Sequence, residues 1–363
     1  MAAGPFTTED LLRRVSRSFY LTLRILPRSV RQQLSCAYLL ARAADTIADT
    51  QLVAVARRLE ALRQLRSGIQ AACEDRTPET PDLGELAKAQ NSIAGQGNAA
   101  ERGLLEKAGY LLDWMRGFQP RDRQEIGRAL DTITRGQELD LIRFGEAAKE
   151  RIAALGSDAD LDHYTYCVAG CVGEFWTKMC RSHVFPELLI PEETLLANGV
   201  QFGKGLQLVN ILRDLTEDLR RGRCYIPQDR LSEHGLLPVQ LLDPAVIVRF
   251  RPLYQSYLKQ AEECLYAGWQ YTAMLPFRHM RIRMACAWPA LIGIKTLAHL
   301  RSGNVLDADK HIKLARSEIR CLILRSTLLY PFPPAWFRLF DAVRRESASP
   351  HGSGGRNSML AWL

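Results

Sequence analysis

The sequence predicts an all-α protein that forms a single domain. Three observations support this. Apolar residues recur with helical periodicity along most of the chain, alternating strand-like runs are scarce, and no linker divides the chain before its last residues. The 363 residues are 47% hydrophobic and 24% charged, an ordinary composition for a globular protein.

The expected helices begin and end at recognisable residues. "TPETPDLG" (Thr77 to Gly84) is expected as a loop, "GSDADLD" carries residues that begin helices, and Gly222 and Pro227 end a helix. We expect a domain over residues 1–346 and a disordered, low-complexity tail over 347–363. The periodicity predicts helices at 8–14, 29–49, 51–73, 99–117, 121–144, 160–182, 192–221, 244–274, 278–301, 310–327 and 333–346.

The basic character of the chain suits an anionic partner. Its net charge is +8, which fits a phosphorylated substrate, a membrane surface or nucleic acid, and equally a surface that serves only solubility. No face interleaves basic and aromatic residues, so we expect no nucleic-acid module. The N-terminus lacks the pattern of a signal peptide, and the apolar stretch Met284 to Ile294 is shorter than the roughly 20 residues needed to span a bilayer. We expect a cytoplasmic protein, soluble or peripheral to a membrane.

The nine cysteines include no CxxC spacing. Cys167 and Cys171 have no nearby Cys or His pair to complete a zinc site, so we expect no such site. Buried, reduced thiols are the expectation.

Two pairs of aspartates follow apolar helical stretches. Asp45 and Asp49 follow "LSCAYLLARAAD", and Asp214 and Asp218 follow "LQLVNIL". Aspartates four residues apart on a helix are neighbours and repel by roughly 0.2–0.5 kcal/mol. In apolar surroundings the cost is larger, because a buried charge must be paired or bind a cation.

A single DxxxD spacing is weak evidence, because a solvated helix face explains it. The third copy, Asp158 to Asp162, begins a helix and is interpreted as capping. The other two copies each have an arginine nearby, Arg42 or Arg213, and Gln207 and Asn210 extend the second pair into a polar stripe. These two copies favour a cation site.

The chemistry that fits two such pairs is the handling of a diphosphate. Mg²⁺ prefers oxygen ligands and usually binds through one or two carboxylates plus phosphate oxygens. Ions between the pairs would stabilise the charge that develops on a departing diphosphate. A departing diphosphate leaves a carbocation, so the remaining cavity should be apolar and dry.

The segment "YTYCVAGCVGEFW" offers a second candidate surface. Tyr164, Val168 and Val172 share one helix face, flanked by the small residues Ala169 and Gly173. Small residues let a ligand or a second helix approach the backbone closely. Tight helix packing is the alternative explanation.

Together these segments resemble the squalene and phytoene synthase family, the head-to-head prenyl synthases. The motifs "SRSF" (Ser16 to Phe19), "RAADTIAD", "YTYCVAGCVGE" and "QLVNILRDLTEDLRRGRCYIP" run in the family's order, and the resemblance covers roughly residues 10–325. It implies an isoprenoid-synthase helical bundle around a central cavity.

The resemblance also implies roles for the matching residues. The metal and catalytic ligands would be Asp45, Asp49, Asp214 and Asp218, with Mg²⁺ as the metal, Mn²⁺ as its alternative, and Tyr164 as the tyrosine that handles proton and diphosphate. The substrate-binding residues would be Ser16, Ser18, Phe19, Arg42, Val168, Ala169, Val172, Gly173, Gln207, Asn210 and Arg213. The residues meeting NADPH would be Arg17, Arg42, Arg213, His311 and Lys313.

The reductive step rests on a partial match. The segment Val305 to Glu318 is similar to the basic segment of squalene synthases that meets NADPH, with His311 and Lys313 where a Lys and an Arg are expected. A solvated basic helix face is the alternative. Ala285 stands where eukaryotic squalene synthases have an aromatic residue, and Ala48 where they have an extra acidic one. These departures concern reduction and metal binding, not condensation.

We therefore expect a squalene synthase that condenses two farnesyl diphosphates through presqualene diphosphate and reduces the product with NADPH, in sterol, hopanoid or carotenoid biosynthesis. The alternative within the family is a non-reducing enzyme that makes presqualene diphosphate, hydroxysqualene, dehydrosqualene or phytoene. A non-catalytic helical scaffold is the alternative from another class, although a degenerate copy should have lost some motif residues. The sequence leaves open the choice between 15- and 20-carbon substrates and the oligomeric state.

Overall fold

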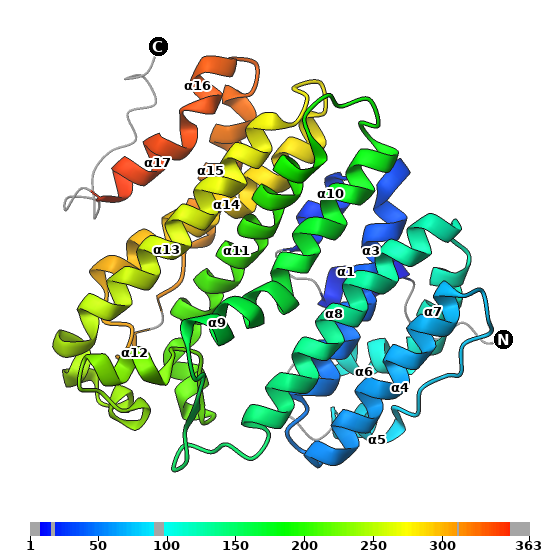
Figure 1. Ribbon diagram of the computed structural model, residues 1–363. Helices are drawn as coiled ribbons and strands as arrows, with labels where there is room; N and C mark the ends of the chain where they lie inside the picture. The colour runs from blue at the N-terminus through cyan, green and yellow to red at the C-terminus, as the bar shows by residue number, and fades with distance from the viewer. Residues whose placement is uncertain (1–7, 16–18, 91–97, 311, 349–363) are drawn as a thin grey trace.

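Helices make up nearly all the secondary structure, as the periodicity predicts (Figure 1). The structure is a computed structural model that describes residues 8–15, 19–90, 98–310 and 312–348. Its α-helices are α1 (Thr8–Val15), α2 (Phe19–Ile25), α3 (Arg28–Asp49), α4 (Val55–Cys73), α5 (Gly84–Ala89), α6 (Asn98–Glu106), α7 (Ala108–Arg116), α8 (Pro120–Phe144), α9 (Asp158–Thr165), α10 (Cys171–His183), α11 (Glu192–Arg220), α12 (Gln228–Glu233), α13 (Ile247–Met274), α14 (Met280–Ser302), α15 (Arg316–Leu329), α16 (Pro333–Phe337) and α17 (Leu339–Ala348). The remaining elements are the π-helical turn η1 (Tyr166–Gly170), the 3₁₀ turns η2 (Pro238–Leu242) and η3 (Pro244–Val246), and the strands β1 (Ala153–Ala154) and β2 (Arg223–Cys224).

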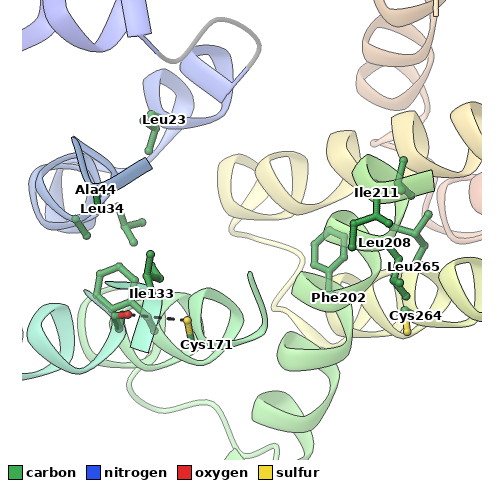
Figure 2. Close-up of a cluster of buried hydrophobic side chains, with 14 of the residues drawn as sticks. Leu23, Leu34, Ala44, Ile133, Cys171, Phe202, Leu208, Ile211, Cys264 and Leu265 are labelled. Carbon is green, nitrogen blue, oxygen red and sulfur yellow. Dashed lines mark hydrogen bonds between the residues drawn. The ribbon is translucent and has the colours of Figure 1, made fainter. Parts of the chain in front are cut away.

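The hydrophobic core lies between two groups of helices that α11 joins. Helix α11 packs against α10 on one side and against α13 and α14 on the other. Figure 2 shows side chains of α2, α3, α8 and α10 on one side of the view and those of α11 and α13 on the other. The core residues labelled there are Leu23, Leu34, Ala44, Ile133, Cys171, Phe202, Leu208, Ile211, Cys264 and Leu265.

Glycines let α10 and η1 approach α11 closely. A Cβ added to Gly173 would lie 2.0 Å from the carbonyl oxygen of Gly199, and one added to Gly203 would lie 2.2 Å from that of Ala169. Such distances exclude any side chain, so glycine is required at this crossing. The packing explanation of these small residues is confirmed, while a role for Gly173 against substrate stays a prediction.

Several helix boundaries differ from the sequence-based expectation. The helix expected over 99–117 is divided into α6 and α7 at Lys107. The helix expected over 310–327 begins only at Arg316, because the Glu318 carboxylate caps it by accepting a backbone N–H at 2.9 Å. The short helices α2, α5 and α12 were not predicted, since too few turns are present to display periodicity.

The C-terminal tail expected over 347–363 overlaps the end of α17. Residues 347 and 348 are helical, and 349–363 lie outside the described residues. The apolar stretch Met284 to Ile294 lies within α14, where most of its residues are buried. Within the described ranges, no helix combines the length and apolarity needed to cross a bilayer.

All nine cysteines are free thiols. Seven are buried, as expected, whereas Cys73 is half-buried and Cys321 is exposed. Cys321 lies on the outer face of α15, which is exposed along its length.

Candidate active site

Both predicted aspartate pairs lie at the C-terminal ends of long helices. Asp45 and Asp49 occupy the last two turns of α3, and Asp214 and Asp218 those of α11. The carboxyl end of a helix carries partial negative charge, which disfavours further anions. Four carboxylates at two such ends are therefore electrostatically unfavourable unless cations join them.

The first pair is tied to neighbouring helices. Gln137 donates a hydrogen bond to the carboxylate of Asp45, and Arg42 lies 3.8 Å from it. Arg42 also forms a 2.6 Å ion pair with Glu101. Desolvation raises the pKa of Asp45 to about 6; Arg42 opposes the rise and the charge of Asp49 adds to it.

The second pair is bound mainly to its own helix. Arg213 contacts Asp214 through two hydrogen bonds, at 2.5 and 2.8 Å. Asp218 forms no side-chain hydrogen bond or ion pair with any residue that the structure describes. Desolvation, followed by the charge of Asp214, raises the pKa of Asp218 to about 7. Among these carboxylates, Asp218 would therefore be stabilised most by a bound cation.

Residues that the sequence analysis did not assign connect the site. Arg223 lies 3.5 Å from Asp49 and 3.6 Å from Asp140 of α8. The hydroxyl of Tyr225 donates to Asp140 at 3.2 Å. Burial raises the pKa of Asp140 to about 6, and Arg223 is the main opposing influence. Asp140 therefore adds a fifth carboxylate to the same region.

A glycine turn brings Arg223 into the site. Gly222 follows α11 with a φ of +81°, in the left-handed region where glycine is favoured. A Cβ there would lie 2.4 Å from the backbone nitrogen of Ala148. Strand β2 then pairs with β1 in parallel, with Ala153 opposite Arg223. This pairing places Arg223 and Tyr225 beside α8.

Tyr164 lies at the end of α9, between the acidic residues. Its ring stacks on that of Tyr225, with centroids 4.7 Å apart and planes at 26°. Burial, then the charges of Asp140, Asp218 and Asp45, raise the pKa of Tyr164 well above its ordinary value. Tyr164 therefore keeps its proton at neutral pH and lies within the electrostatic influence of both aspartate pairs; its catalytic role stays a prediction.

The other residues expected to bind substrate lie on η1, α10 and α11. Val168 and Ala169 are half-buried in η1, and Val172 is 37% exposed on the face that continues from Tyr164. On α11, Gln207 is half-buried and Asn210 exposed, and the amide of Asn210 donates to Gln207 at 3.5 Å. Their role in binding substrate stays a prediction.

A polar pocket of about 370 Å³ adjoins the second aspartate pair. It lies between α11 and the segment that precedes α15, and the hydroxyl of Thr216 donates to the carbonyl of Val305 where the two meet. Its charged lining residues are Arg213, Asp214, Glu217, Arg220, Asp307, Lys310 and Lys313. The predicted cofactor residues Arg213 and Lys313 thus line one pocket.

Some predicted residues cannot be placed. Ser16, Arg17, Ser18 and His311 lie outside the described residues. Phe19 is the first residue of α2, and its side chain is likewise outside the described part.

The third DxxxD copy caps its own helix and forms structural contacts with α11 and α13. The Ser157 hydroxyl accepts the backbone N–H of Asp160 at 3.3 Å, and the Asp160 carboxylate accepts that of Ser157 at 3.0 Å. Asp158 accepts from the hydroxyl of Tyr257 at 2.6 Å, and Asp162 pairs with Lys204 at 2.7 Å. The capping interpretation is confirmed.

The donor set suits a cation that arrives with an anionic ligand. Among the described residues, no three His, Cys, Asp or Glu side chains converge to bind a metal by themselves. The carboxylates stand in pairs, and Mg²⁺ typically takes one or two carboxylates and completes its shell with phosphate oxygens and water. The paired carboxylates therefore fit Mg²⁺ bound together with a diphosphate.

Comparison with known proteins gives consistent matches. The model of the family "Squalene/phytoene synthase" matches residues 12–318. A phytoene synthase from Mycobacterium bovis is 26% identical over 315 residues, which cover 85% of each chain. One from Thermus thermophilus is 31% identical over 181 residues, and the match covers 50% of this chain and 58% of that relative. The chain spans only 34% of a bifunctional lycopene cyclase/phytoene synthase from Blakeslea trispora.

Solved structures share the fold. A ligand complex of TcSQS superposes with a TM-score of 0.73 at 20% identity, covering 95% of this chain and 92% of that one. A dehydrosqualene synthase in complex with a ligand gives a TM-score of 0.63 at 22% identity, covering 90% and 96%. At these identities the likeness establishes the fold alone.

Proposed function

The chain belongs to the squalene/phytoene synthase family, and from that premise we propose that it joins two prenyl diphosphates head to head. The observation that carries this proposal is the link between the two aspartate pairs: Arg223 lies 3.5 Å from Asp49 and its charge also acts on Asp218, while Asp45 and Asp218 both raise the pKa of Tyr164. The absence of any described side-chain partner for Asp218, whose pKa is about 7, supports a site that awaits cations.

The aspartates and the arginines of the site would have different roles. The carboxylates of Asp45, Asp49, Asp214 and Asp218 would bind Mg²⁺, which neutralises charge on the diphosphate as it departs. Arg42, Arg213 and Arg223 each lie beside one of these aspartates and would offer guanidinium donors to diphosphate oxygens. When the diphosphate binds, these arginines would exchange their present carboxylate partners for its oxygens.

Tyr164 supplies a neutral hydroxyl beside the departing group. Its raised pKa keeps the proton on the phenol at neutral pH, so it donates a hydrogen bond to a diphosphate oxygen. Stacking on Tyr225, which Asp140 fixes, orients the ring. The apolar side chains of η1 and α10 would, with the prenyl chains bound, limit the access of water to the carbocation.

For the product, we propose squalene from two farnesyl diphosphates with NADPH as reductant. The pocket that Arg213, Lys310 and Lys313 line supports this, because it offers cations to an anionic cofactor next to Asp214. A non-reducing reaction is the second candidate. The relatives named phytoene synthase, from Thermus thermophilus and Mycobacterium bovis, favour it.

Product analysis of the purified protein tests both. The protein is incubated with farnesyl diphosphate and Mg²⁺, with and without NADPH, and in parallel with geranylgeranyl diphosphate. Squalene formed only with NADPH supports the reductive reaction, and phytoene, dehydrosqualene, hydroxysqualene or accumulated presqualene diphosphate supports the second candidate. If neither substrate is consumed, the proposal of head-to-head synthesis is wrong and the scaffold alternative gains weight.

A further inference from the structure

We propose that the end of the bundle opposite the aspartates docks onto bilayers that contain anionic phospholipid. The contact region, called here the α15–α16 surface, has an apolar centre and an arginine rim. Its apolar residues are Met280, Leu324, Leu328, Phe332 and Phe337, and its rim residues are Arg278, Arg281, Arg320 and Arg338. Docking concerns a different surface from the proposed active site and does not depend on that proposal.

Helix contacts fix the place of this surface. The ring of Tyr330, after α15, stacks on that of Phe277, before α14, with centroids 4.3 Å apart. Glu318, in the first turn of α15, instead lies 3.3 Å from His299 near the end of α14. The two helices are thus antiparallel, and Figure 1 shows α16 at one end of the bundle and α12 at the other. Along α11 the distance from Glu192 to Asp214 is about 30 Å.

The centre of the surface exposes large apolar side chains on adjacent turns. Leu324 and Leu328 are 54% and 53% exposed on one face of α15, and Phe332, in the following turn, is 62% exposed. The exposed prolines 331, 333 and 334 limit the motion of that turn. Soluble proteins rarely gather exposed apolar groups in this way without a binding partner.

A rigid cluster supports these side chains from below. Arg283 is 1% exposed and lies 4.5 Å from the ring centre of Trp336 and 5.0 Å from that of Phe277. Its Nη1 donates to the backbone carbonyls of Ala273 and Leu275. The apolar groups of the surface are therefore held in place before any partner binds, which reduces the entropy lost on docking.

The arginine rim selects the partner. Arg278, Arg281, Arg320 and Arg338 are exposed, and within the described residues none of them pairs with a carboxylate. Glu346, the acidic residue nearest to the end of α17, is bound by Arg325 at 2.8 Å. Protruding aromatic and leucine side chains ringed by arginines match the interface of an anionic bilayer. A symmetric contact between two copies would place arginines against arginines.

Cys321 allows a direct test. It is the exposed cysteine of the chain and lies on the same face of α15 as Leu324 and Leu328. An environment-sensitive fluorophore on Cys321 is titrated with vesicles of phosphatidylcholine alone and with vesicles of equal parts phosphatidylcholine and phosphatidylglycerol. We expect a blue shift with the anionic vesicles that high salt weakens.

Two sets of variants separate the contributions. Leu328→Ser with Phe332→Ser should weaken vesicle binding about tenfold or more, and Arg281→Gln with Arg338→Gln should weaken it about tenfold and reduce its salt dependence. Val248→Ser, an exposed valine (78%) on α13 far from this surface, is the matched control and should bind as the parent. Circular dichroism confirms that all variants fold.

Three results would overturn the proposal. One is no shift with anionic vesicles, and another is unchanged binding by the Leu328/Phe332 variant. The third is an oligomer, seen by light scattering of the parent, that the same variant dissociates, because the surface would then join copies of the chain.

Discussion

The two ends of the bundle treat buried charge differently. At one end Asp45, Asp140 and Asp218 are crowded and only partly neutralised, and their pKa values are raised to about 6, 6 and 7. At the other end, Arg283 is almost fully buried, bonded to backbone carbonyls and enclosed by the rings of Trp336 and Phe277. Its Nε and Nη2 have no described acceptor, and ring faces take that place.

The difference separates function from stability. Crowded carboxylates destabilise the folded protein through their mutual repulsion. Bound cations and substrate would relieve this repulsion, and such a trade of stability for function is common at functional sites. The enclosed arginine connects α14 with α16 and stabilises the fold. Variants of the crowded carboxylates should therefore lose activity without losing stability, and variants of Arg283 should do the reverse.

The largest effect is expected at the acidic end. Asp218→Asn and Asp45→Asn should each reduce turnover of farnesyl diphosphate about 1,000-fold, because a cation ligand and the charge that stabilises the departing diphosphate are lost. The melting temperature should stay equal or rise, since a repelling charge is removed. Turnover assays and calorimetry measure both. Asp158→Asn, in the structural DxxxD copy, is the control and should keep its turnover; a normally active Asp218→Asn would refute the site.

The second effect tests the aromatic end. Arg283→Met should destabilise the fold by about 2–4 kcal/mol, because two carbonyls lose their donor and the cation–π contacts disappear. Turnover at 25 °C should change less than about twofold, since the change is remote from the chemistry. Denaturant unfolding measures the difference against Arg281→Met, an exposed neighbour. Equal stability of the two variants would contradict the supporting role of Arg283.

The third effect sharpens the account of Tyr164. Tyr225→Phe keeps the stacked ring and removes the hydroxyl that donates to Asp140. We expect kcat to fall about tenfold and stability to fall by about 1 kcal/mol, since buried Asp140 loses a hydrogen bond. When Tyr164 has already been replaced by Phe, the further substitution Tyr225→Phe should lower kcat much less than it does in the parent. If the two substitutions instead act additively on kcat, Tyr225 does not work through Tyr164.

The smallest effect concerns pH. The folded-state pKa values of Asp45, Asp140 and Asp218 lie above the ordinary 3.8. Between about pH 4 and pH 7 these three carboxyl groups thus bind more protons in the folded protein than in the unfolded chain, and their contribution to stability falls as pH rises through that window. Urea unfolding of metal-free protein at several pH values measures the slope. Asp218→Asn should flatten it near pH 7, and an unchanged slope would contradict the assigned environment of Asp218.

Features that depend on the spacing of nearby residues could be predicted from the sequence. Asp45 and Asp49 share a face because helix geometry dictates it, and the acidic residues from Asp158 to Asp162 indicated the start of a helix. The long helices carried enough turns to show their period. Short helices such as α12 did not, and the break at Lys107 has no strong residue signal.

What the sequence analysis missed depends on contacts between distant segments. Asp140 meets Tyr225 across 85 positions, and only the left-handed turn at Gly222 and the pairing of β2 with β1 create that contact. Gln137 and Asp140 lie three residues apart on α8, but that helix also carries many other charged residues, such as Arg135 and Glu138, so they do not stand out in the sequence. Arg283 is enclosed by residues from two other segments of the chain, and this contact likewise leaves no pattern in the sequence.

The most direct test of the central claim is a thermal-shift measurement with Mg²⁺ and an unreactive thio-analogue of farnesyl diphosphate. We expect the two ligands together to raise the melting temperature well above the sum of their separate effects, because the carboxylate pairs would bind metal and diphosphate as one unit. Asp218→Asn should lose this joint stabilisation. Equal stabilisation of parent and variant, or none in the parent, would contradict a metal–diphosphate site between the two aspartate pairs.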